Sequence, residues 1–175
     1  VIHPTVQGLV KEGMPYLGFL YAGLMIDHQG NPRVLEYNCR FGDPETQPIL
    51  MRMRSDLAQL CQAALNGGLE QFEIEWDTRF ALGVVMVADG YPGDYRRGDK
   101  ISGLDQVRSD NIKVFHAGTR REAGQVVTDG GRVLCVTALG DTVDAAQRQA
   151  YSAVSGIDWD GADWRPDIGW RALNS

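Results

Sequence analysis

The sequence has 175 residues, which is long enough to bury a core as one large domain or two small ones. It is 43% hydrophobic, 23% charged and 9% aromatic, an ordinary composition for a globular protein. The formal net charge of −6 gives no electrostatic basis for binding nucleic acid. No apolar run approaches the roughly 20 residues of a membrane span. We therefore expect neither a nucleic-acid nor a membrane partner.

The sequence contains three cysteines, Cys39, Cys61 and Cys135. They are widely spaced and odd in number, so they match neither a disulfide framework nor a zinc site. Such cysteines suit a reducing compartment, and we expect a cytoplasmic protein.

The first residues are Val1-Ile2-His3-Pro4, with no initiator methionine. They run straight into a helical pattern, which indicates a cut inside a longer protein. We expect the chain to act together with missing N-terminal domains of the same polypeptide.

A short helix is predicted over residues 4–13, because it begins with a proline and ends at a glycine. Two apolar runs follow at 17–26 and 33–38, separated by the turn-forming residues 27–32. This pattern predicts two buried strands joined as a hairpin.

Residues Asp43-Pro44-Glu45 are typical of a helix start, with Asp43 as the N-cap, Pro44 in the first helical position and Glu45 in the first turn. Apolar residues then recur near a 3.6-residue period over 49–65. Ser55 could cap a second helix, so the segment is either one bent helix or two. Residues 66–68, Asn-Gly-Gly, end it.

The composition changes after about residue 76. Short strands are predicted at four places: 81–88, 112–116, 125–128 and 132–138. Residues 129–131, Asp-Gly-Gly, resemble a hairpin turn between the last two. Asp141-Thr142 should cap a helix that runs to about Gly156. The predicted architecture is the end of an α/β domain over 1–76, followed by a small α+β domain over 77–175.

Glu36 and Asn38 are the strongest candidates for chemistry, because two residues that are two apart on a strand point to the same face. A carboxylate and an amide oxygen side by side suit Mg²⁺, which keeps several waters and bridges to substrate phosphates. Arg40 can reach that face if the strand continues, and its guanidinium would stabilise negative charge on a transferring phosphoryl group.

The triplet by itself is also compatible with a solvated strand face. Its context favours a site, since the polar residues end an apolar strand and lead into a turn that opens a helix. In α/β sheets, ligands bind at such strand ends, and helix N-termini attract anions.

The stretch 35–48, LEYNCRFGDPETQP, resembles the signature of the phosphoribosylamine–glycine ligases, which are also called glycinamide ribonucleotide synthetases and belong to the ATP-grasp superfamily. Similar motifs occur in the same order over nearly the whole chain, at 18–25, 83–85, 90–95, 115–119, 130–134 and 167–169. The resemblance implies a fold: the C-terminal part of an ATP-grasp domain followed by a small α+β domain.

The resemblance also implies a reaction in purine biosynthesis. ATP phosphorylates the carboxylate of glycine, and the amine of 5-phosphoribosylamine displaces the phosphate to give glycinamide ribonucleotide and ADP. Glu36 and Asn38 would hold Mg²⁺ or Mn²⁺, and Arg40 would be the catalytic residue that faces the phosphates. Asp43 and Glu45 would lie in the substrate-binding loop.

Other interpretations remain open. Asp43 is also explained as a helix cap, and Glu45 as a charge that favours the helix dipole. The chain could belong to another ATP-grasp carboxylate–amine ligase or to a biotin-carboxylase-like enzyme, since the latter share the E-x-N-x-R pattern. A non-catalytic interaction module with the same fold is the alternative from a different class.

Overall fold

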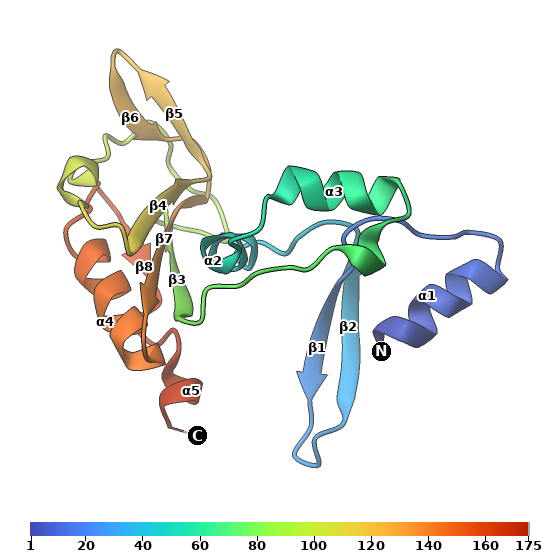
Figure 1. The fold of residues 1–175 in the computed structure, drawn as a ribbon. Coiled ribbons are helices and arrows are strands. Elements are labelled where there is room, and N and C mark those ends of the chain that lie inside the picture. The colour runs from blue at the N-terminus through green and yellow to red at the C-terminus, as the bar shows by residue number, and fades with distance from the viewer. Residues whose placement is uncertain (175) are drawn as a thin grey trace. The chain divides into compact units, whose positions relative to one another are not determined.

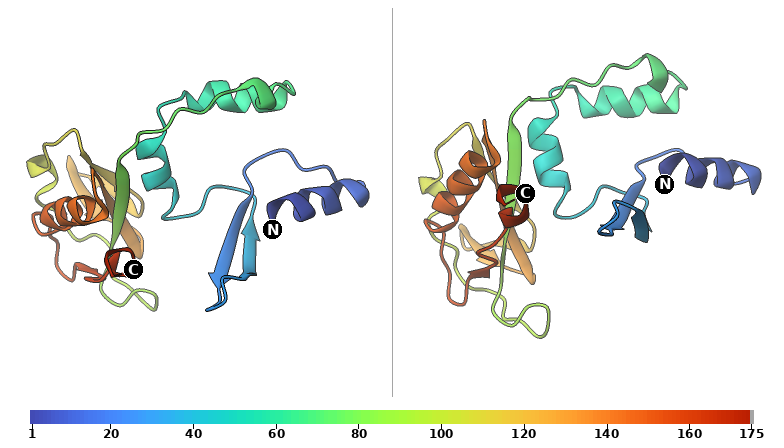
Figure 2. Two further views of the ribbon diagram at one scale, coloured as in Figure 1. Left: turned by 60° about the horizontal axis from the view of Figure 1, so that its bottom comes forward. Right: turned by 90° about the horizontal axis from the view of Figure 1, so that it is seen from below.

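The computed structural model describes residues 1–174, which form two compact units. The first unit comprises Val1–Asp43 and Ser55–Glu75, and the second comprises Pro44–Arg54 and the chain from Trp76 onward. Figures 1 and 2 show the elements of both units in chain order. Among the described residues, no helix is long and apolar enough to span a membrane.

The first unit opens with helix α1, Ile2–Lys11, which confirms the helix predicted at 4–13 but begins two residues earlier. The chain leaves the helix through Gly13, whose φ of +76° is a conformation that glycine adopts without strain. Strands β1, Tyr21–Ile26, and β2, Pro32–Asn38, then pair antiparallel as the predicted hairpin (Figure 1).

The prediction that both hairpin strands are buried is wrong for the described residues. Apolar side chains on both strands are more than 40% exposed, namely Leu24, Met25, Ile26, Val34 and Leu35. The reason is that β1 and β2 form a two-stranded sheet, to which no third strand of residues 1–174 adds. A two-stranded ribbon has too little surface to bury its own apolar side chains.

The helical segment after the hairpin is two helices, α2 at Thr46–Arg52 and α3 at Leu57–Leu65. The break falls at Met53, whose ψ of 120° is extended. The cap of α3 is Asp56, whose carboxylate accepts hydrogen bonds from the backbone N–H groups of the first turn at 2.7 and 3.1 Å. Ser55, the predicted cap, instead accepts a hydrogen bond from the backbone N–H of Glu75.

The end of α3 was predicted correctly. The backbone N–H of Gly68 donates to the carbonyl of Ala63 at 2.8 Å, and Gly67 has a φ of +71°. These are the features of a glycine-terminated helix end. A short 3₁₀ helix, Leu69–Gln71, follows.

The second unit is built on a four-stranded antiparallel sheet in the order β4-β7-β3-β8. Its strands are β3 Phe80–Val87, β4 Ile112–His116, β7 Arg132–Gly140 and β8 Asp163–Trp164. Helix α4, Val143–Val154, covers one face of this sheet (Figure 2). Three of these strands and the helix match the predicted segments, whereas β8 was not predicted.

The core lies between the sheet and α4. Alternate residues of β3, Leu82, Val84 and Met86, are at most 8% exposed and belong to one apolar cluster with the inner face of α4. The alternation is the period of two expected for a strand with one buried face. Thr142 caps α4 as predicted, accepting a hydrogen bond from the backbone N–H of Ala145 at 3.0 Å.

The remaining strands are β5, Thr119–Glu122, and β6, Gln125–Thr128, which pair with each other as a hairpin. The prediction that residues 129–131 turn between the strands 125–128 and 132–138 is therefore wrong. These residues instead connect two different sheets. The backbone passes very close to itself at Gly118 and Gly130. A Cβ on Gly118 would lie only 2.5 Å from the Gly130 Cα.

The described chain ends with the short helix α5, Trp170–Leu173, and a 3₁₀ turn, Leu104–Gln106, precedes β4. Trp159 belongs to the core of the second unit, and Trp164 packs against that core.

Candidate functional site

The strand end that carries Glu36 and Asn38 brings their side chains into contact. The Asn38 Nδ2 donates to the Glu36 Oε1 at 3.1 Å. Both side chains lie on the face that they share with their cross-strand partners: Gly23 pairs with Glu36, and Tyr21 pairs with Asn38. The predicted adjacency of the two residues is therefore confirmed, while their role stays a prediction.

A β-bulge lies next to Glu36. The pairing shifts between Gly23 and Leu24, because Gly23 is opposite Glu36 but Leu24 is opposite Val34. Leu35 is the extra residue of β2. Bulges re-aim side chains and increase local twist, and they are frequent beside functional sites.

The opposite face of the hairpin holds α1. Tyr37, between the two candidate ligands, points to that other face, and its hydroxyl lies 2.7 Å from the Thr5 hydroxyl of α1. The rings of Phe19 and Phe41, at the open end of the hairpin, have centroids 4.1 Å apart. The contact between Tyr37 and Thr5 therefore lies on the face opposite Glu36.

Arg40 lies two residues beyond the end of β2, so the strand does not continue to it. Its guanidinium donates to the carbonyl of Phe41 at 2.8 Å. Asp43 follows in an exposed turn of the same unit. Helix α2 begins only at Thr46, so the prediction that Asp43 is its N-cap is wrong.

Glu45 occupies the N-cap position of α2 and makes no side-chain capping hydrogen bond. The sequence pattern predicted it inside the first turn, directly after Pro44, so the helix begins later than expected. Glu45 belongs to the second unit, whereas Glu36, Asn38 and Arg40 belong to the first.

The donor atoms of the pair fit a hard cation with one adjustment. Asn38 presents its amide nitrogen to Glu36, and a cation requires the amide oxygen. A half-turn of the amide exchanges the two atoms. Within residues 1–174 no group of three His, Cys, Asp or Glu side chains could hold a metal. The pair would thus supply two oxygen ligands, as Mg²⁺ sites completed by waters and phosphate require.

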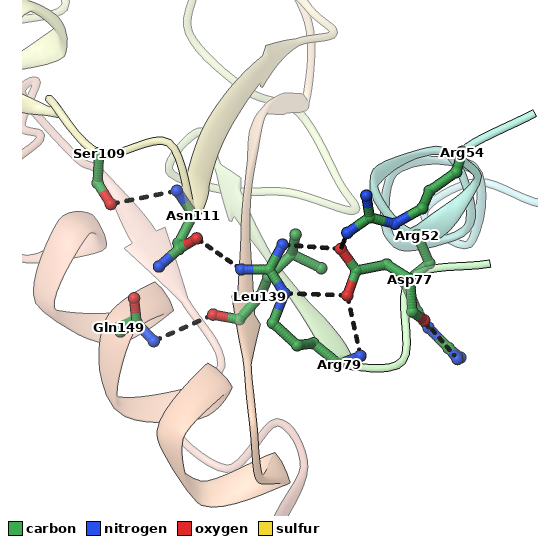
Figure 3. Close-up of polar contacts among 8 residues, drawn as sticks. All are labelled: Arg52, Arg54, Asp77, Arg79, Ser109, Asn111, Leu139 and Gln149. Carbon is green, nitrogen blue, oxygen red and sulfur yellow. Dashed lines mark hydrogen bonds and ion pairs between the residues drawn. The ribbon is translucent and has the colours of Figure 1, made fainter.

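A polar cluster that was not predicted from the sequence lies in the second unit, around Asp77 (Figure 3). Asp77 is 5% exposed, and its carboxylate accepts from the Arg79 guanidinium at 2.7 and 2.9 Å and from Arg54 at 2.8 Å. The backbone carbonyl of Asp77 accepts two further bonds from Arg52. Arg52 and Arg54 therefore have structural roles in this cluster.

The cluster continues to the sheet through Asn111, whose side-chain oxygen accepts from Arg79 at 2.7 Å (Figure 3). The hydrogen bonds of the Arg79 guanidinium hold the pKa of the Asp77 carboxyl well below its usual range. The only sequence signal was the Asp-x-Arg spacing of 77 and 79, since the other partners are more than 20 residues away.

A cavity of the second unit with a volume of about 660 Å³ lies on the sheet face that α4 does not cover. It is lined by β3 residues such as Val85 and Val87, together with Tyr91, Arg132 and Trp164. Most of this lining is apolar, and it includes no residue of the hairpin that carries Glu36.

Two family models match the chain. The C domain of phosphoribosylglycinamide synthetase matches residues 81–171, and the ATP-grasp (A) domain of the same synthetase matches residues 1–46. The chain is 62% identical over 174 residues to the phosphoribosylamine–glycine ligase of Escherichia coli O157:H7, and 60% identical over 173 residues to that of Vibrio parahaemolyticus. Each alignment covers 99% of this chain but only 41% and 40% of the relative.

Solved structures give the same result. The crystal structure of a phosphoribosylamine–glycine ligase from Thermotoga maritima matches with a TM-score of 0.79 and 37% identity, over 93% of this chain and 40% of that one. The biotin carboxylase domain of a 2-oxoglutarate carboxylase from Hydrogenobacter thermophilus, solved with MgADP and bicarbonate, matches with a TM-score of 0.63. At 14% identity, the second match shows the fold alone.

The fold is thus the C-terminal part of an ATP-grasp protein, as predicted. The chain belongs to the phosphoribosylglycinamide synthetase family. It spans about 40% of the length of the curated relatives that it matches.

Proposed function

We propose that the full-length protein is a phosphoribosylamine–glycine ligase, which joins glycine to 5-phosphoribosylamine with consumption of ATP in purine biosynthesis. The observation that carries the proposal is about 60% identity to ligases of that name over 99% of this chain. The γ-phosphoryl group of ATP would pass to the glycine carboxylate. The amine would then attack the acyl phosphate, forming the amide and releasing phosphate.

In this reaction Glu36 and Asn38 would hold Mg²⁺ or Mn²⁺ through one carboxylate oxygen and the amide oxygen. The bound cation would neutralise charge on the phosphates of ATP. Support comes from the contact between the two side chains and from the chemistry of their donors.

Arg40 is proposed as the catalytic residue that donates to the phosphate or acyl-phosphate oxygens. Its present bond to a backbone carbonyl leaves the other guanidinium donors for such a role. Asp43 and Glu45 are proposed to contact substrate, because they lie in the loop between Arg40 and α2. We also propose the domain boundary at residues 76 and 77, and a cytoplasmic location.

The remaining domains of the polypeptide are proposed partners, because the relatives are about 2.5 times as long as this chain. ATP-grasp sites enclose the nucleotide between two lobes, and the match of this chain to the ATP-grasp (A) domain extends over residues 1–46 alone. We therefore expect no ligation by residues 1–175 alone.

The test is the conversion of glycine, 5-phosphoribosylamine and MgATP by the full-length protein. Wild-type protein should form glycinamide ribonucleotide and ADP, and Glu36→Ala should lower kcat/KM by roughly 100-fold or more, since a metal ligand is lost. The matched control is Glu70→Ala, an exposed glutamate of the same unit. Wild-type turnover by Glu36→Ala would contradict the metal assignment. Full-length protein that does not bind MgATP would indicate the non-catalytic module.

A further inference from the structure

We propose that Gly23 is a positioning residue for the Glu36 carboxylate, because the space left by its missing side chain is where Glu36 lies. This inference rests on the proposed function, since it concerns the cation site of that reaction.

The contact between the two residues is direct. Gly23 is opposite Glu36 in the hairpin, and it is buried although Glu36 itself is exposed. A Cβ built on Gly23 would lie 3.1 Å from the Glu36 Cγ and 3.7 Å from the Tyr21 ring. The side chain of Glu36 therefore leans across the neighbouring strand instead of standing away from it.

The glycine is required for space and not for backbone conformation. Gly23 is not among the glycines with positive φ, so any L-residue can adopt its backbone angles. Glycine inside a strand lowers stability relative to residues with a side chain. A strand glycine that brings no conformational benefit is best explained by the side chain that covers it.

A methyl group added at Gly23 would displace one of the two proposed cation ligands. A distance of 3.1 Å between two carbon atoms is well inside the 3.5–4.0 Å of a favourable contact. Glu36 is exposed on its outer side and would swing outward. That movement would separate its Oε1 from the Asn38 amide, which is 3.1 Å away in the present arrangement. The two ligands would then no longer converge on one cation.

The experiment compares full-length wild-type protein with Gly23→Ala, using Mn²⁺ binding in the presence of ADP as the first measurement. We expect Gly23→Ala to weaken Mn²⁺ binding by roughly 10- to 100-fold, the effect typical of residues that orient metal ligands. Its unfolding midpoint should stay at or above that of wild type. Gly8→Ala is the matched control, because nothing lies within 4 Å of a Cβ at that glycine of α1.

A double-mutant cycle with Glu36→Ala separates positioning from general damage, since alanine at 36 has no Cγ for the new methyl group to meet. In that background Gly23→Ala should leave Mn²⁺ affinity unchanged, and it should not lower the unfolding midpoint. Equal losses in both backgrounds, or Mn²⁺ affinity within twofold of wild type for Gly23→Ala, would overturn the proposal. Wild-type protein that binds MnADP but forms no amide would defeat the proposed function and leave the role of Gly23 measurable.

Discussion

At the scale of single residues, Asp77 is the most heavily bonded carboxylate described above. Its oxygens accept four hydrogen bonds, three from Arg79 and one from Arg54. A charge with so little exposure is stable only when it is paired and fully hydrogen-bonded. Asp77 thereby links the end of α2 to the beginning of β3 within the second unit.

The lowered pKa of Asp77 determines how its contribution to the free energy of unfolding changes with pH. Below the ordinary carboxyl pKa of about 3.8, Asp77 takes up a proton in the unfolded chain but not in the folded one. The stabilisation is therefore complete above about pH 5 and is lost as the pH falls from there toward the folded-state pKa. Asp77→Asn should lower the free energy of unfolding at pH 7, and by less at pH 3.

This prediction is checked by urea unfolding of both proteins at pH 7, 5 and 3. Asp110→Asn, at an exposed aspartate before β4, is the matched control. A difference between wild type and Asp77→Asn that is constant over this range would show that the charge of Asp77 is not what stabilises the fold.

The candidate cation ligands and Asp77 differ in what local sequence can reveal. Glu36 and Asn38 are two apart on one strand, so their contact follows from the strand period alone. Arg54 lies 23 residues from its partner Asp77, and Asn111 lies 32 residues from its partner Arg79. Such pairings depend on tertiary structure, which no local pattern encodes.

At the scale of elements, the strands with apolar residues were predictable, whereas the polar strand β5 and the two-residue strand β8 were not. Segments 112–116 and 125–128 agree with β4 and β6 at both ends. Strand β5 has the sequence TRRE, and β8 has only two residues, so neither shows an apolar alternation. The burial of β1 and β2 was not predictable, because burial depends on what covers a strand and not on its own residues.

The crossing of Gly118 and Gly130 gives a prediction at this scale. An alanine at 118 would place its Cβ 2.5 Å from the Gly130 Cα and 2.7 Å from the Arg132 carbonyl oxygen, both backbone atoms that cannot turn aside. We expect Gly118→Ala to lower the free energy of unfolding by about 1–3 kcal/mol, the usual cost of overpacking.

The measurement is equilibrium unfolding in urea, with Gly156→Ala as the control. A Cβ at Gly156 would meet only the Ala153 carbonyl oxygen, at 3.5 Å. If Gly118→Ala were as stable as this control, the backbone crossing would not be as close as described.

At the scale of the whole molecule, the two units differ in how much apolar surface they bury. The second unit contains an apolar cluster that includes β3, β7 and α4. In the first unit, only Gly23, Gly42 and Leu60 are buried among the described residues. Burial of apolar surface is the main favourable term in folding, so the stability of the chain should reside in the second unit.

Amide hydrogen exchange on the 175-residue chain tests this distribution. We expect the slowest exchange in β3, β7 and α4, and exchange faster by several orders of magnitude in the β1–β2 hairpin. In the full-length protein the hairpin should gain protection, because the family's remaining domains would be present. Equal protection of hairpin and sheet in the 175-residue chain would refute the assignment of stability to the second unit.

The short length of β8 affects the tendency of the second unit to self-associate. Strand β8 pairs only with Met86 and Val87, so from Phe80 to Val85 no strand of residues 1–174 lies on that side of β3. This edge reads FALGVV, which contains no charge or proline of the kind that discourages strand-to-strand association. At high concentration, self-association of the chain should therefore begin at this edge, and a lysine at Ala81 is the first substitution to consider for keeping it monomeric.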